Sequence, residues 1–170
     1  MKQLEEAEYV KIVLAKEGDL DRILEIYAAA KAFMRKSGNP NQWNGSYPER
    51  ELLAQDIRKK QLYVMRENGH LCGVFAYITG EDPTYSYIEN GAWLNNEPYG
   101  TIHRIAGDGT VKGLLARAAA FCAEKNPNIR VDTHKDNKPM QHALEKNGFH
   151  YCGIIYLANG DPRLAFQRYL

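Results

Sequence analysis

Three glycines lie close together where the sequence passes from a β-type run into a helical one. Gly107, Gly109 and Gly113 fall within seven residues, between segment 101–105 and an alanine- and leucine-rich stretch. A helix N-terminus presents free backbone N–H groups and the positive end of the helix dipole, and glycines let backbone approach a ligand closely. The pattern therefore favours a phosphate site. The alternative is an ordinary strand-to-helix turn that needs glycine for positive φ angles.

The loop matches neither of two common phosphate-binding motifs. It lacks the G-K-[ST] ending that gives a P-loop its lysine and its magnesium-binding hydroxyl. The G-x-G-x-x-G spacing also fails, because Thr110, Val111 and Lys112 follow Gly109. A dinucleotide-binding fold further requires a series of parallel βαβ units, whereas this chain offers hairpins.

One histidine stands in the strand before the glycines. Alternate residues of an extended strand share a face, so the odd-numbered residues of segment 99–105, including His103 and Ile105, are expected on one side. The unperturbed pKa of histidine, near 6.5, suits proton transfer near neutral pH. His103 is therefore a candidate base, and a histidine hydrogen-bonded inside the sheet is the alternative. Arg104, expected on the opposite side, is expected to pair with a carboxylate.

Two loop segments, 37–47 and 81–98, carry aromatic side chains together with a carboxylate. Their members are Trp43, Tyr47, Tyr85, Tyr87, Glu89 and Trp93. Aromatic faces and a negative charge suit an ammonium-bearing ligand, through cation–π attraction and charge. Hydrophobic packing beneath long loops is the alternative explanation.

Hydrophobic periodicity and turn signals predict the order β-α-α-β-β-β-α-β-α-β-β. Strands are expected at 9–15, 62–67, 70–80, 99–105, 129–133, 149–157 and 163–170. Helices are expected between Gly18 and Gly38, from an S-x-x-E capping box at 46–49 to Lys59, over 112–124, and from a cap at Asn137 to Asn147. Segment 81–98 is expected to be a long loop with short strand pieces. The fold class is α/β (α+β), with helices on both faces of a mixed, mostly antiparallel sheet, in one domain spanning 1–170.

Composition narrows the function classes. The 170 residues carry a net charge of +1 with no basic run, which argues against a nucleic-acid partner. The apolar stretches are too short to span a bilayer, and the N-terminus lacks the apolar region of a signal peptide. Three isolated cysteines share no metal-ligand spacing and indicate a reducing, cytoplasmic location.

Two motifs in order resemble the GCN5-related N-acetyltransferases, the GNAT family. Segment 137–149 follows the family pattern N-x(5)-A-x-E-K-x-G-F closely, from Asn137 to Phe149. Segment 110–115 aligns with the family's pyrophosphate loop, [QR]-x-x-G-x-[GA], and matches it at Gly113. Thr110 and Leu115 stand where that loop has a polar and a small residue. The resemblance covers residues from about 9 to 170.

The resemblance implies a GNAT fold that moves acetyl from acetyl-CoA directly to a primary amine of a small molecule or peptide, with no metal. The pantetheine arm is expected along segment 99–105, against backbone groups of His103 and Ile105, with Asn137 offering its side-chain amide. The diphosphate is expected on the backbone amides of Thr110, Val111, Lys112, Gly113, Leu114 and Leu115. Acceptor recognition is expected from the aromatic and acidic residues of segments 37–47 and 81–98.

The resemblance also bears on the acid that protonates the leaving thiolate. The family's frequent acid is a tyrosine just before E-K-x-G-F, where this sequence has Leu144. Tyr151 or Tyr156 is expected to substitute, or else water. Two alternatives to the enzyme remain: a non-catalytic acyl-CoA-binding or sensor module of the same fold, and a nucleotide-phosphate binder that uses the glycine loop alone. A homodimer is possible.

Overall fold

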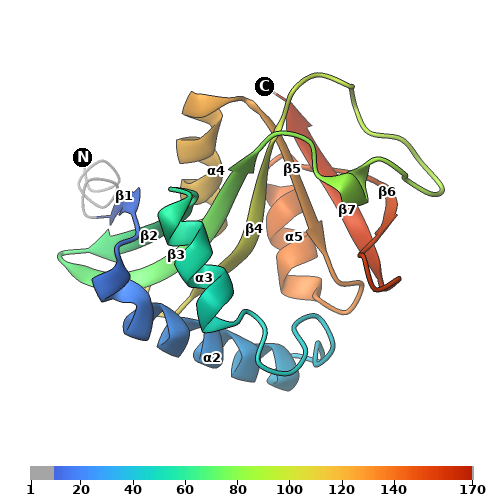
Figure 1. Ribbon diagram of the computed structural model, residues 1–170. Helices are drawn as coiled ribbons and strands as arrows, with labels where there is room; N and C mark the ends of the chain where they lie inside the picture. Colours follow the sequence, from blue (N-terminus) through green and yellow to red (C-terminus); the bar gives the residue numbers. More distant parts are fainter. Residues whose placement is uncertain (1–9, 170) are drawn as a thin grey trace.

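Seven strands form one sheet that helices cover on both faces (Figure 1). The computed structural model describes residues 10–169. In sheet order the strands are β1 (Val10–Leu14), β2 (Leu62–Glu67), β3 (His70–Thr79), β4 (Gly100–Gly107), β5 (Asn128–Thr133), β7 (Pro162–Tyr169) and β6 (His150–Tyr156). The helices are α2 (Leu20–Lys36), α3 (Arg50–Arg58), α4 (Leu114–Lys125) and α5 (Lys138–Lys146), with short 3-10 turns η1 (Glu17–Asp19) and η2 (Pro83–Tyr85). The predicted order of elements and the fold class are confirmed.

Strand alternation divides the core between the two faces of the sheet. In β2, Leu62 and Val64 pack with α2 and α3, whereas Tyr63 and Met65 pack with α4 and α5. Both sets of side chains are nearly or fully buried. The sheet is therefore the middle layer of three, which Figure 1 shows with α2 and α3 on one side and α4 and α5 on the other.

The sheet opens between its fourth and fifth strands. β4 and β5 run parallel and pair at two positions, Gly100 with Ile129 and Thr101 with Arg130. The named strands pair antiparallel everywhere else in the sheet. Beyond Thr101 the two strands diverge toward their C-terminal ends, which leaves a gap in the middle of the molecule.

Two local predictions are wrong. α3 begins at Arg50 and its N-cap is Glu49. The hydroxyl of Ser46 donates to the carboxylate of Glu49 (3.2 Å) instead of forming the predicted capping box. The face alternation of segment 99–105 fails at Arg104, where a β-bulge places one extra residue of β4 opposite β3. Ile105 consequently packs toward α4 and α5, and the Arg104 side chain reaches α3.

Candidate active site

Two cavities lie along the gap between β4 and β5. The His103 cavity, about 570 Å³, is lined by His103, Asp82 and Asp132 among other residues. The glycine-loop cavity, about 500 Å³, is lined by Gly107, Asp108, Gly109 and mostly apolar side chains. Four residues belong to both linings: Met34, Ile105, Asn137 and Met140. The two cavities therefore adjoin at the β4 bulge.

The glycine-loop cavity ends at the N-terminus of α4. Gly113 is the N-cap residue and has a left-handed conformation (φ 73°), and within residues 10–169 no side chain caps the helix there. A Cβ atom at Gly113 or Gly109 would meet no described atom within 4 Å. At Gly107 it would lie 2.4 Å from Leu114 Cδ1, so this glycine allows the helix to pack on the strand. The start of α4 thus presents uncapped N–H groups beside open space, as an anion site requires. The predicted donor N–H of Thr110, in contrast, already donates to Oδ1 of Asp108 (3.0 Å).

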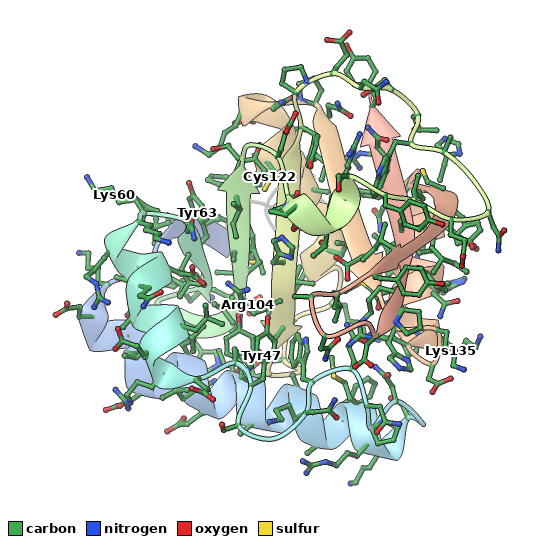
Figure 2. The ribbon with its side chains drawn as sticks, turned by 45° about the vertical axis from the view of Figure 1, so that its right-hand side comes forward. Tyr47, Lys60, Tyr63, Arg104, Cys122 and Lys135 are labelled. Atoms are coloured by element: carbon green, nitrogen blue, oxygen red, sulfur yellow. The ribbon has the colours of Figure 1, made fainter. Side chains whose placement is uncertain are left out.

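The β4 bulge is held by side chains from α2 and from the loop and helix that follow. Arg104 has a positive φ of 51°, which is unusual for a residue with a side chain. Its carbonyl accepts a hydrogen bond from Tyr27 (2.8 Å), and its guanidinium contacts the buried carboxylate of Asp56 and the Tyr47 hydroxyl. Figure 2 shows Arg104 and Tyr47 close together above α2. These contacts keep the peptide groups of Arg104 and Ile105 out of the ladder with β3, where the two cavities meet.

His103 faces a carboxylate that the loop between β3 and β4 holds in place. Its Nε2 lies 3.3 Å from Oδ2 of Asp82. The other oxygen of Asp82 accepts hydrogen bonds from the N–H and the hydroxyl of Thr84 (2.9 and 2.7 Å). Burial raises the pKa of Asp82, but the contacts with His103 and Thr84 outweigh burial and hold this pKa at about 2. Asp82 is therefore charged near neutral pH, and it orients the imidazole.

A second carboxylate, Asp132 of β5, also lines the His103 cavity. Its Oδ2 accepts a hydrogen bond from the hydroxyl of Tyr85 (2.6 Å), which is itself buried. Burial raises the pKa of Asp132, and the nearby His103, Tyr85 and Arg163 oppose that shift. The cavity thus combines an oriented imidazole with two carboxylates.

Solved structures with this fold identify the family. A GNAT-family acetyltransferase from Streptococcus agalactiae is 34% identical, covers 95% of each chain and superposes with a TM-score of 0.86. The chain belongs to the GNAT family of acetyltransferases. A structure named as a putative acetyltransferase from Staphylococcus aureus is 29% identical over 93% of this chain and 97% of its own, with a TM-score of 0.67. Neither a family model nor a curated protein matches the sequence.

A third structure supports the fold alone. It is named as a GNAT-family acetyltransferase from Listeria monocytogenes and is 18% identical over 95% of each chain, with a TM-score of 0.67. The GNAT-family relative at 34% identity places this chain among N-acetyltransferases. The resemblance noted in the sequence is confirmed, and the enzyme is favoured over the non-catalytic alternatives.

The acetyltransferase brings only part of the predicted acceptor set together. Trp43 and Tyr47 line the His103 cavity, and Tyr85 lies beneath it with its hydroxyl on Asp132. Glu89 and Trp93 are outside that lining. The Glu89 carboxylate accepts from the Tyr156 hydroxyl, and the Trp93 indole N–H donates to the carbonyl of Tyr85 (2.9 Å).

Trp93 and Glu89 instead fasten the long loop to the sheet. The Arg130 guanidinium lies 4.0 Å from the ring centroid of Trp93 and 3.9 Å from that of Tyr99, within cation–π range of both. The backbone of Glu89 pairs with Ile154 of β6. The loop of residues 81–98 is thus held against β5 and β6.

Asn137 lines both cavities, but its side-chain amide is already engaged. Its Oδ1 accepts from the N–H of Met140 (3.2 Å) and caps α5, as the sequence predicted. Its Nδ2 donates to Oε1 of Gln42 (2.9 Å). A contact between this amide and a cosubstrate would therefore require that Gln42 give up its bond.

The predicted acids lie away from both cavities. Tyr151 is 51% exposed and packs edge-on against Phe166, and the Tyr156 hydroxyl binds Glu89. Leu144 is fully buried in the core beneath α4 and α5. None of Leu144, Tyr151 and Tyr156 lines either cavity.

Sequence reasoning missed three residues of this site: Asp82, Asp132 and Gln42. Asp132 could have been recognised from the sequence, because it lies inside the short strand 129–133, which was expected to be buried. A carboxylate is rarely buried unless it has a partner or a function. Asp82 and Gln42 lie in loops among many polar residues, and only the tertiary structure singles them out.

Two kinds of feature are absent from residues 10–169. No group of three or more His, Cys, Asp or Glu side chains is arranged to hold a metal ion. None of the helices described is long and apolar enough to cross a membrane.

Proposed function

We propose that this acetyltransferase moves acetyl from acetyl-CoA to the primary amine of a small molecule or peptide. One observation carries the proposal: the glycine-loop cavity and the His103 cavity meet at the β4 bulge. An uncapped helix N-terminus lies at one end and an oriented imidazole at the other. This arrangement can bring a thioester and an amine together from opposite sides.

The residues around the glycine-loop cavity suit coenzyme A. Apolar side chains of α2, α4 and α5, among them Phe33, Leu114 and Pro139, line the path to the bulge and would contact the pantetheine arm. The N–H groups at the start of α4 would bind the diphosphate, since no acidic residue stands in the first turn of that helix. When bound, acetyl-CoA supplies the activated acetyl group.

The chemistry on the other side needs a base. An amine arrives as an ammonium ion and must lose a proton before its nitrogen can attack. With Nε2 of His103 directed at Asp82, the other ring nitrogen, Nδ1, is the one that accepts this proton. The nitrogen then bonds to the acetyl carbon and the carbon–sulfur bond breaks. The proton held by His103 passes to the departing thiolate, and the second proton that the nitrogen loses as the amide forms is released to solvent. Backbone N–H groups at the bulge would stabilise the negative charge on the carbonyl oxygen.

Thermal unfolding tests cosubstrate binding. At a hundred times its dissociation constant a ligand stabilises the folded state by about 2.7 kcal/mol, so acetyl-CoA should raise the melting temperature of the wild type. Gly113→Asp should abolish the increase, because a carboxylate at the start of α4 repels the diphosphate. Gly69→Asp is the matched control, since Gly69 also has a positive φ (81°) with no atom near its Cβ position. Unchanged melting of the wild type in millimolar acetyl-CoA would refute the proposal.

Thiol release with a panel of amines tests the base. His103→Ala should lower turnover by about 10²- to 10⁴-fold, the usual contribution of a general base. Acetyl-CoA should still stabilise this variant as it does the wild type. His150→Ala, which removes an exposed histidine of β6, is the control and should retain full turnover. Wild-type turnover in His103→Ala would return His103 to a structural role.

A further inference from the structure

Asp132 is a carboxylate that the fold buries in part without giving it a cationic partner. It lies between the buried residues Val131 and Thr133 of β5, and it faces the His103 cavity. Within residues 10–169 no lysine, arginine or histidine nitrogen lies within 4.0 Å of its oxygens. Its one hydrogen bond comes from the neutral hydroxyl of Tyr85. Such a charge is costly to desolvate unless something pairs with it.

The two arginines in the lining of the cavity are already occupied. Arg104 is paired with Asp56. Arg163 donates to the backbone carbonyls of Pro162 (2.8 Å) and Gln42 (2.9 Å). The cavity therefore keeps a carboxylate without an ion pair, while one of its guanidinium groups is paired with Asp56 and the other is held by two backbone carbonyls.

We propose that Asp132, with Tyr85 beneath it, binds the ammonium group of the acceptor, and that the site selects amines without a carboxylate beside the nitrogen. This inference rests on the proposed function and names its acceptor class: alkylamines, diamines and polyamines in preference to α-amino acids. An α-carboxylate would enter beside Asp132, which repels it, and the Arg163 guanidinium is held by two backbone carbonyls. An alkyl chain would instead lie against the rings of Trp43 and Tyr47.

The matched pair Asp132→Asn and Asp136→Asn tests the ammonium site. The asparagine at 132 keeps an oxygen for the Tyr85 hydroxyl and removes only the charge. A hydrogen bond to a charged group contributes about 1.5–3 kcal/mol, so binding of 1,4-diaminobutane should weaken roughly 10- to 100-fold. We expect this loss in the KM of the amine and in its dissociation constant by calorimetry without acetyl-CoA. Asp136→Asn changes a partly exposed carboxylate of the following loop and should change neither the KM nor the dissociation constant.

The melting temperature of Asp132→Asn distinguishes a binding role of Asp132 from a purely structural one, because the two roles predict changes of opposite sign. Because burial raises the pKa of Asp132, its charged form is less favourable in the fold than in the unfolded chain. Folding stability from this group is therefore greatest at low pH and falls as pH rises through the raised pKa. Asp132→Asn should leave the melting temperature at pH 7 unchanged or raise it, whereas loss of a structural carboxylate would lower it.

Different experimental results would contradict the role of Asp132 and the proposed function. Unchanged diamine binding in Asp132→Asn would overturn it, as would a lower melting temperature with unchanged KM. Acetylation of glycine or glutamate as fast as that of 1,4-diaminobutane would overturn the acceptor class. Failure of acetyl-CoA to stabilise the wild type would overturn the proposed function instead, and the calorimetric comparison of diamine binding would still decide the role of Asp132.

Discussion

Asp56→Ala is expected to destabilise the protein strongly, because it removes the carboxylate that neutralises Arg104 beneath α3. Their side chains are 4% and 9% exposed, respectively, so solvent screens the pair little. Removing one partner of a buried ion pair typically costs about 3–5 kcal/mol, since the remaining charge is left uncompensated. For a chain of this length each kcal/mol lowers the melting temperature by roughly 2–4 °C, which gives a drop of roughly 6–20 °C.

Urea denaturation followed by circular dichroism measures this loss directly. Asp21→Ala is the matched control, because the Asp21–Arg50 pair is 86% and 58% exposed and should contribute nothing measurable. Adding Arg104→Met to Asp56→Ala should recover much of the lost stability, since no charge is then left buried. A loss in Asp56→Ala below about 1 kcal/mol, the range of exposed pairs, would refute the reasoning.

Three further outcomes follow from individual contacts. Gly91→Ala should prevent stable folding, because its Cβ would lie 1.8 Å from the carbonyl oxygen of Cys152; Gly18→Ala, with open space, should melt like the wild type. Hydrogen bonds from Thr110 and contact with His70 outweigh burial and lower the pKa of Asp108 from 3.8 to about 2, so its stabilisation is present above pH 4 and lost as pH falls toward 2. Asp108→Asn should weaken that pH dependence in urea titrations. Leu144→Tyr should lower the melting temperature without raising turnover, because the site is fully buried and overpacking typically costs about 1–3 kcal/mol.

Elements defined by neighbouring residues could be predicted from the sequence. The hairpin of β2 and β3 follows from an Asn-Gly turn between two β-rich runs, and α5 begins at Asn137, whose side chain caps it. The capping box at 46–49 failed because the Ser46 hydroxyl binds the Glu49 side chain, not a backbone N–H. An S-x-x-E pattern is therefore compatible with a helix N-terminus but does not determine where the helix begins.

The centre of the site could not be predicted, because distant residues create it. The bulge at Arg104 depends on Tyr27 and Asp56, which are 77 and 48 residues away in the sequence. The pairing of Asp132 with Tyr85 likewise joins β5 to a loop 47 residues earlier. His103 was predicted from its strand, whereas Asp82, which orients it, was recognisable only from the folded arrangement.

The opening between β4 and β5 also bears on how the molecule folds. β1 to β4 form one group of neighbouring antiparallel strands, and β5, β7 and β6 form a second antiparallel group. In residues 10–169 the ladder between these groups consists of two residue pairs. Units that few backbone hydrogen bonds join can open separately, and contacts between residues near in sequence form early in folding. We therefore expect native-state hydrogen exchange to resolve two cooperative units, with their boundary at Thr101 and Arg130.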